Sequence, residues 1–381
     1  MKKKIMSIVL SASMLASLGM SQGVMAEEDD GVIKIGVVAP MTGGLAVLGE
    51  GSQHSVDMAV EEINEQGGYQ IEILNSGNLA DDASDPTQAI NAYNSLLAED
   101  PDVIVGTYNS SCSIPMAELA QEGSMVMLSP GSTNVEVTEV GDYIFRTCFI
   151  DPYQGEMAAQ FAQSEGYTTA AVIYANDDDY SNGLYQAFEE AAADSGIEIL
   201  YVGECTTKDT DFTAQVSQAV ASGAEMLFYP CFLDTVPLLV QQARDAGFTG
   251  AIVGGDAWDG CDTAGLETAF ENTFYTNHFS YEDTSEAVQN YVTKFTENYG
   301  SDTLTACAAL YYDSIYMVAA AAEAGGGTDT ESIKTGMTNL EFSGVTGSFT
   351  LNDTGDPIKP VVVNTLVDGA CTWYTTLEPA E

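Results

Sequence analysis

Two segments of the sequence place hydroxyl groups directly before a predicted helix. One is 107–115, with the letters TYNSSCSIP, and the other is 129–136, with the letters SPGSTNVE. Each follows a short apolar run that is typical of a buried strand. Free backbone N–H groups and hydroxyls at a helix N-terminus bind anions. The two segments therefore predict a carboxylate-binding site.

Helix capping is the simpler explanation of either segment alone. Thr133 and Glu136 match a capping box, and the serines at 110 and 111 are common capping residues before a helix with an early proline. In open α/β sheets, however, ligands bind beyond the carboxyl ends of the strands. Because both segments follow strands of the same predicted sheet, we favour one shared site over two separate caps.

Acidic and aromatic residues follow two later strands. Asp256 and Trp258 lie in the segment GGDAWD, where they suit an ammonium group and an apolar wall. The acidic run 177–179 could hold a cation, but a solvated loop is the preferred interpretation. Tyr180, directly after that run, could cover a ligand.

No pattern of catalytic residues is present. The glycines of segment 40–49 match neither G-x-G-x-x-G nor a P-loop, and fit a turn close to a ligand better. There is no G-x-S-x-G motif, and His54 and His278 have no evident partner, so we expect both to be structural. The seven cysteines form no C-x-x-C pair, so neither a metal nor a cofactor is predicted.

The composition excludes several partners. There are 57 acidic and 10 basic residues, for a net charge of −47. Nucleic acid needs a basic face, and anionic lipid is disfavoured for the same reason. Hydrophobic residues make up 45% of the chain, so acidic disorder is not indicated. We interpret the acidic surface as solubilising.

The N-terminus reads as an export signal. Lys2, Lys3 and Lys4 precede an apolar stretch, and small residues end at Ala26. This is the pattern of a signal peptide over 1–26. The first cysteine of the chain is Cys112, so we expect no lipid anchor near the N-terminus. We expect an extracytoplasmic protein, periplasmic, cell-wall-associated or secreted. The remaining 355 residues suggest two domains, and no later run is long enough to span a membrane.

Strands and helices alternate along the mature chain. The predicted strands are 32–39, 71–74, 103–106, 125–128, 170–174, 197–202, 226–229 and 251–253. The predicted helices are 49–66, 85–98, 183–193, 212–221, 236–246, 286–299 and 306–324, and strands and turns are expected over 344–374. Asp85 and Asp151 each open a helix as cap, with proline next and glutamine third. Two βαβ arrays predict an α/β protein with two Rossmann-like lobes and mainly parallel sheets.

Eight motifs in order identify a resemblance. The chain resembles the Leu/Ile/Val-binding proteins of branched-chain amino-acid ABC transporters, which have the type I periplasmic-binding-protein fold. The matching segments are 33–40, 59–64, 81–86, 129–133, 143–147, 178–180, 242–244 and 254–259. The resemblance implies a three-crossover hinge near 146–149, 274–280 and 356–360. Lobe one would then be 32–147 plus 276–356, and lobe two 148–275 plus 357–381.

The resemblance also implies a role for individual residues. Ser110 and Thr133 would bind a ligand carboxylate, with backbone N–H groups beside them, the carbonyl of Gly131 would accept from the ligand ammonium, and Asp256 would neutralise it. The remaining site residues that it implies or that lie in the two hydroxyl segments are Leu48, Tyr108, Ser111, Ser132, Tyr180, Phe232 and Trp258. Together they would form a site for a free zwitterion, since a buried charge is tolerable only when it is paired.

Three positions depart from the family pattern. Phe232 stands where the family often has a tyrosine, and Asp256 is shorter than the glutamate of some relatives. Ser84 stands where some relatives have a disulfide cysteine. The first two departures leave the preferred ligand open: a branched-chain amino acid is the default, and an aromatic or small amino acid or a peptide-like amide is an alternative.

The resemblance implies a transport protein rather than an enzyme. The closed, ligand-bound protein, which we expect to be a monomer, would dock on ABC permease subunits in the membrane. A sensor that reports amino acids to a receptor is an alternative of the same class. A secreted enzyme is less favoured because no nucleophile or metal site is evident, and a purely structural surface protein would not need Ser110, Thr133 and Asp256 to converge.

Overall fold

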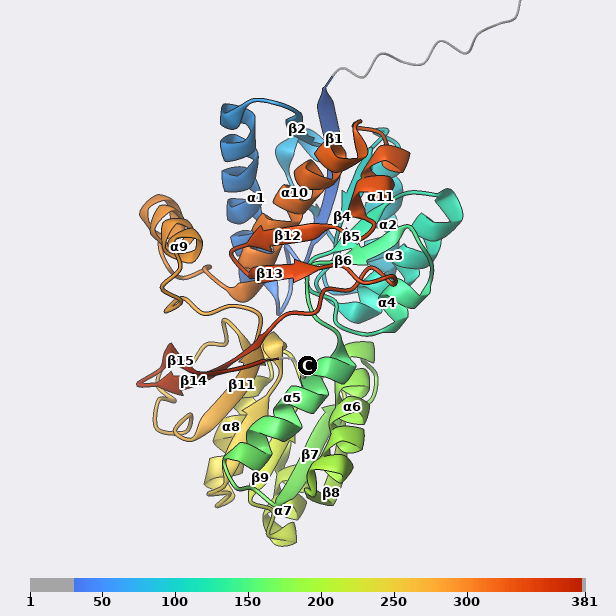
Figure 1. Ribbon diagram of the computed structural model, residues 1–381. Helices are drawn as coiled ribbons and strands as arrows, with labels where there is room; N and C mark the ends of the chain where they lie inside the picture. The colour runs from blue at the N-terminus through green and yellow to red at the C-terminus, as the bar shows by residue number, and fades with distance from the viewer. Residues whose placement is uncertain (1–30, 379–381) are drawn as a thin grey trace, which may run out of the picture.

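The computed structural model describes residues 31–378, and in it the chain forms two lobes (Figure 1). The predicted signal peptide over 1–26 lies outside these residues. Each lobe contains one large sheet with helices packed against it. None of the helices in the described part of the chain is both long and apolar enough to cross a membrane.

The first sheet has the strand order β2–β1–β4–β5–β6, with β3 also paired to β1, and its pairs are parallel. Its strands are β1 Val32–Ala39, β2 Gln70–Ile73, β3 Ala80–Asp81, β4 Val103–Val105, β5 Met127–Ser129 and β6 Ile144–Arg146. The connecting helices are α1 Ala46–Gln66, η1 Asn75–Gly77, α2 Pro86–Leu97, α3 Ser110–Gly123 and α4 Glu136–Glu139. Parallel strands covered on both faces read as nearly continuous apolar runs, which is why β1 was visible in the sequence.

The second sheet has the order β15–β14–β11–β10–β9–β7–β8. Its strands are β7 Thr169–Ala175, β8 Glu198–Cys205, β9 Met226–Tyr229, β10 Ala251–Gly254, β11 Thr273–Asn277, β14 Val361–Val367 and β15 Ala370–Leu377. The helices are α5 Asp151–Ser164, α6 Asp179–Ser195, α7 Thr213–Ser222, α8 Val236–Asp245 and η2 Asp256–Trp258. The antiparallel pairs of this sheet are the two that β14 makes, with β11 and with β15, and the other pairs are parallel. The predicted α/β class with two mainly parallel sheets is confirmed.

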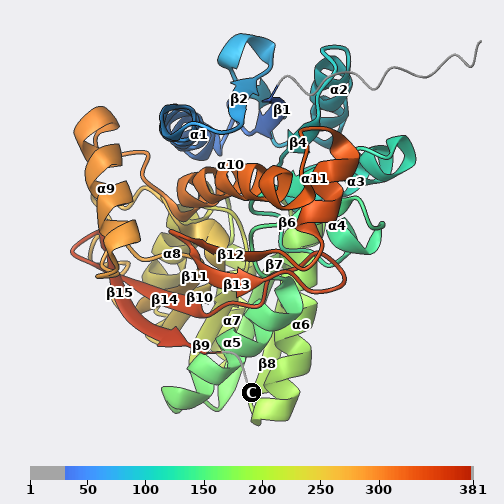
Figure 2. The ribbon, with the colours of Figure 1, turned by 45° about the horizontal axis from the view of Figure 1, so that its top comes forward.

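Within residues 31–378, the chain passes between the lobes three times. The passages follow β6, follow β11 and precede β14 (Figure 1). Between the second and third, α9 Glu286–Tyr299, α10 Ala306–Gly325, α11 Thr330–Met337 and the hairpin β12 Glu341–Gly344 with β13 Gly347–Thr350 return to the first lobe. Helix α10 packs on α1, which Figure 2 shows nearly end-on above one end of α10.

Contacts across the two lobes show that they are closed on each other. The side-chain amide of Asn134 donates to the carbonyl oxygen of Asp179 at 2.8 Å. The amide N–H of Ala306, at the start of α10, donates to Oδ2 of Asp259 in the second lobe at 2.5 Å. The second contact uses the first N–H of α10, which has no partner within the helix itself.

One of the two predicted aspartate caps is confirmed. The side chain of Asp85 accepts from the N–H of Gln88 at 3.0 Å, as the sequence indicates for the start of α2. Helix α5 also begins at the predicted place, but Asp151 makes no capping hydrogen bond there. The prediction that Asp151 caps α5 is therefore wrong, and its side chain is free for another role.

Candidate ligand-binding site

Asp256 lies at the centre of a buried hydrogen-bond cluster. It follows the carboxyl end of β10, an inner strand of the second sheet, and is only 2% exposed. Its Oδ1 accepts from Nε2 of Gln154 at 2.9 Å and from the hydroxyl of Tyr180 at 3.0 Å. Its Oδ2 lies 3.1 Å from Nε2 of His278. Three side chains from α5, α6 and the segment after β11 therefore hold one carboxyl group in place.

The charge of Asp256 has no cationic partner at neutral pH. Burial lowers the pKa of His278 to about 4, although hydrogen bonding to Asp256 acts in the opposite direction. His278 is thus a neutral donor at pH 7, and no lysine or arginine among residues 31–378 forms an ion pair with Asp256. Neutral donors stabilise a buried carboxylate but do not cancel its charge. The carboxyl group of Asp256 therefore has no cationic partner among the described residues.

Thr133 presents a buried hydroxyl that has no hydrogen-bond partner of ordinary geometry among the described residues. The predicted capping box with Glu136 is wrong, because the N–H of Glu136, the first of the single-turn helix α4, donates to Oδ1 of Asn134 at 2.9 Å instead. An unsatisfied buried hydroxyl costs about 1–3 kcal/mol. A ligand acceptor at this point would remove that cost.

Ser110 forms the first turn of α3 and is 1% exposed. Its Oγ accepts from the N–H of Asn134 at 3.3 Å, which leaves its own proton available to a ligand. Helix α3 begins earlier than expected, so Pro115 lies beyond the first turn. This start places Ser110 in the turn whose N–H groups are free, which suits an anion.

Two further serines of the predicted site are used within the protein. The Oγ of Ser132 donates to the carbonyl of Thr107 at 3.0 Å and holds the two loops together. The Oγ of Ser111 accepts from the N–H of Asp179 at 3.0 Å and donates to Asp178 at 3.2 Å, so it joins the two lobes.

The interpretation of the acidic run 177–179 as a solvated loop is wrong for Asp178, which is buried. It is 5% exposed, and its Oδ1 accepts from the N–H of Ser181 at 2.9 Å as the N-cap of α6. Burial raises the pKa of Asp178 to about 6, while these hydrogen bonds lower it. The acid therefore orients the helix that carries Tyr180.

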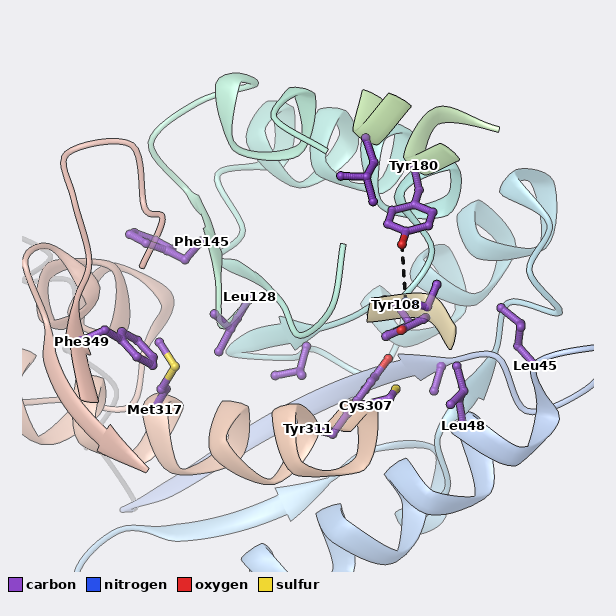
Figure 3. Packing of buried hydrophobic residues seen from close by; sticks show 14 of the residues in the cluster. Leu45, Leu48, Tyr108, Leu128, Phe145, Tyr180, Cys307, Tyr311, Met317 and Phe349 are labelled. Carbon is purple, nitrogen blue, oxygen red and sulfur yellow. Dashed lines mark hydrogen bonds between the residues drawn. The ribbon is translucent and has the colours of Figure 1, made fainter. Parts of the chain in front are cut away.

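Aromatic rings form the apolar side of the site. Figure 3 shows Tyr180 reaching from α6 toward Tyr108, with Leu48 and Cys307 beyond it. The dashed line is the bond that the N–H of Ala257 donates to the Tyr180 hydroxyl at 3.4 Å. Phe232, after β9, has its ring centre 5.1 Å from that of Tyr180 and 6.4 Å from that of Tyr108.

Glycine at 131 permits this packing. A Cβ atom there would lie 2.3 Å from the ring of Tyr108, which is closer than real Cβ contacts come.

A groove of about 460 Å³ opens between the lobes beside Phe232 and is also lined by Leu45, Ser111 and Asp178. This groove reaches the aromatic side of the site from solvent.

Trp258 lies in the core of the second lobe. It is fully buried, and its Nε1 donates to the carbonyl of Tyr229 at 2.9 Å. Its ring packs near that of Tyr275 with 6.4 Å between their centres. These contacts support the loop that carries Asp256.

Sequence reasoning missed Gln154 and His278. The sequence offered no evident partner for His278, and in the structure its ring contacts Asp256. Gln154 is 102 positions from Asp256 in the sequence, and no local pattern connects them. The one available signal was the glutamine after Asp151 and Pro152 at the start of α5, which was interpreted as part of a cap.

Comparison with known proteins agrees with this architecture. The family model described as periplasmic binding protein matches residues 32–370. Leu/Ile/Val-binding protein homolog 3 of Brucella melitensis is 26% identical over 359 residues, which is 93% of this chain and 95% of that protein. The chain therefore belongs to the periplasmic binding protein family.

Solved structures narrow this class. The leucine binding protein LivK of Thermotoga maritima is similar with a TM-score of 0.85 and 31% identity, covering 91% of this chain and 99% of that one. The branched-chain amino acid substrate-binding protein LivJ of Streptococcus pneumoniae, in complex with isoleucine, has a TM-score of 0.83 and 25% identity over 91% and 100% of the two chains. The predicted membership of the Leu/Ile/Val-binding group is confirmed, and with it the type I two-lobe fold of an ABC-type substrate-binding protein.

Proposed function

We propose that this protein captures a free amino acid, branched-chain by default, between its lobes and delivers it to an ABC permease. The observation that carries the proposal is the pairing of two incomplete groups. Asp256 is a buried carboxylate without a cation, and Thr133 is a buried hydroxyl without an acceptor at ordinary hydrogen-bond geometry. A zwitterion supplies both missing partners at once.

Each end of the ligand would have its own set of contacts. The ligand carboxylate would accept from Ser110 and Thr133 and from free N–H groups at the start of α3. The ammonium would bind Asp256 and the carbonyl oxygen of Gly131. The side chain would lie against Leu48, Tyr108 and Phe232, whose apolar surface favours an aliphatic group.

Ligand capture would stabilise the closed arrangement of the lobes. Thr133 belongs to the first lobe and Asp256 to the second, so a bound zwitterion contacts both. A ligand shifts an equilibrium only by its difference in affinity between the two states, and a bridging ligand has that difference. The closed form of a monomer outside the cytoplasm would then dock on the permease. Lobe boundaries at 147/148, 275/276 and 356/357 belong to this proposal.

A thermal-shift screen tests the assignment directly. The mature protein would be heated with each of the twenty amino acids and with amine-free organic acids. A ligand that binds only the folded state raises the melting temperature. We expect the largest rise with leucine, isoleucine or valine. A rise with an amine-free acid, and with no amino acid, would remove Asp256 from its proposed role.

A further inference from the structure

Asp151 is a buried acid for which the proposed ligand contacts provide no use. It lies in the first turn of α5 and is 2% exposed. Neither of its side-chain oxygens makes a hydrogen bond of ordinary geometry within residues 31–378. Its backbone N–H donates to the carbonyl of Thr133 at 2.8 Å, which brings the two residues together. A buried carboxylate in such a position is costly.

The surroundings of Asp151 are shaped to hold the carboxyl group. A Cβ atom on Gly183 of α6 would lie 2.8 Å from Oδ2 of Asp151 and 2.7 Å from the amide nitrogen of Asn134. Glycine at 183 therefore lets α6, which packs on α5 within the second lobe, cover the acid. The hydroxyl of Thr133 is close enough to lower the pKa of Asp151, although it lies outside ordinary hydrogen-bond geometry.

The charged groups around Asp151 act in both directions. Asp256 in η2 and Asp178 at the start of α6 disfavour a second negative charge, and burial disfavours it most. Arg146 favours the carboxylate, but this guanidinium is already paired with Asp356 at 2.7 Å. The N-terminal end of α5 also favours the carboxylate, since its first N–H groups have no partner within the helix. Burial is the largest of these effects and holds the pKa of Asp151 well above its usual range.

The protonation state of Asp151 decides what Thr133 can offer a ligand. A hydroxyl has one proton to donate. If Asp151 were ionised, it would compete for that proton and repel a ligand carboxylate. If Asp151 were protonated, its O–H could donate to Oγ of Thr133, and Thr133 could donate its own proton to the ligand.

We propose that Asp151 is a positioning residue for the ligand carboxylate and that ligand capture is accompanied by uptake of one proton at its side chain. The inference rests on the proposed function, since it needs a ligand carboxylate at Thr133. The proton comes from the buffer as the lobes close over Asp151. It returns to the buffer when the lobes open and the ligand leaves.

Calorimetry measures this proton directly. Leucine would be titrated into the mature protein at one pH in buffers that differ in ionisation enthalpy. The dependence of the observed heat on that enthalpy gives the number of protons taken up. We expect uptake of up to one proton for each leucine bound. The affinity should then fall by up to tenfold for each unit by which the pH rises, between the pKa values of Asp151 in the open and closed forms. Binding without buffer dependence at any pH from 5 to 8 would overturn the inference and leave the proposed function intact.

Three variants assign the proton to a residue. Asp151→Asn keeps a donor toward Thr133 and cannot titrate, so we expect proton uptake and the associated pH dependence of the affinity to disappear. Glu156→Gln, an exposed acid on the same helix, is the matched control and should keep both. Asp178→Asn tests the other raised acid near the lobe contact. Uptake that persists in Asp151→Asn and vanishes in Asp178→Asn would overturn the assignment. If Asp151→Asn does not fold, persistence of uptake in Asp178→Asn supports Asp151 and its loss contradicts the assignment.

Discussion

Arg146 and Asp356 form a buried ion pair, with Nε of the guanidinium 2.7 Å from Oδ1 of the carboxylate. Arg146 ends β6, just before the first passage between the lobes, and Asp356 lies before the third. The same guanidinium donates from Nη1 to the carbonyls of Ser132 and Asn134 at 2.8 and 3.0 Å. One arginine therefore connects the hinge region to the loop that carries Thr133.

Removal of one partner of this pair should destabilise the protein strongly. Asp356→Ala leaves the Arg146 charge buried without its counter-ion, a change that costs about 3–5 kcal/mol in comparable sites. Urea unfolding followed by circular dichroism measures the loss. Asp353→Ala, three residues earlier and exposed, is the matched control and should change the free energy of unfolding by less than about 0.5 kcal/mol. Equal stability of the two variants would contradict the structural role of the pair.

The carboxylate of Asp256 should dominate amino-acid affinity. Asp256→Asn keeps the size of the side chain and removes the charge that would face the ammonium. Loss of one partner from a buried charge pair costs about 2–5 kcal/mol, so we expect an affinity at least about 30-fold lower by calorimetry. Asp262→Asn, on an exposed part of the same loop, should bind as the parent does. Unchanged affinity in Asp256→Asn would show that the ligand carries no ammonium at this place.

The fold could be predicted from the sequence because its signals are local. Buried parallel strands read as apolar runs, and Met226–Tyr229 has the predicted bounds in the structure. Asp256 and Ser110 could be chosen as candidates because both follow such strands, and ligands bind at that edge. Their positions directly after predicted strands were enough to select them as candidate site residues.

The interior of the site could not be predicted in the same way. Gln154 and His278 reach Asp256 only because α5 and the segment after β11 meet β10 in the folded protein. The predicted Thr133 capping box does not form because the side chain of Asn134 accepts from the N–H of Glu136 at the start of α4. Arg146, from strand β6, donates to the carbonyls of Ser132 and Asn134 and so fixes the same loop. Such competition between local and distant partners leaves no trace in the spacing of residues.

The depressed pKa of His278 should appear in the pH dependence of stability. Its folded-state pKa is about 4, against an ordinary value of 6.5, so below pH 6.5 the unfolded chain binds a proton that the folded protein does not. Stability contributed by neutral His278 is therefore full above pH 6.5 and is lost as the pH falls to 4, by about 3 kcal/mol in all. His278→Gln has no titrating ring, and the difference in unfolding free energy between the parent and this variant should shrink over that interval. A difference that stays constant from pH 7 to pH 4 would mean that the ring titrates alike in both states.

Phe232 should set the size limit of the ligand side chain. Its ring lies against Tyr108 and Tyr180 and narrows the apolar side of the site. Phe232→Ala removes most of that ring, and the space it leaves is next to the groove that opens between the lobes. We expect leucine affinity to fall by about 10-fold or more, because apolar contact is lost, and phenylalanine affinity to rise relative to leucine.

The hydroxyl missing at this position offers the matched comparison. Phe232→Tyr keeps the ring and adds one hydroxyl, so it should keep the preference for aliphatic side chains while Phe232→Ala loses it. Competition of phenylalanine against labelled leucine measures the ratio in the parent and in both variants. If the ratio is the same in all three, Phe232 does not touch the ligand side chain, and the size limit must come from Leu48 and Tyr108 in the first lobe.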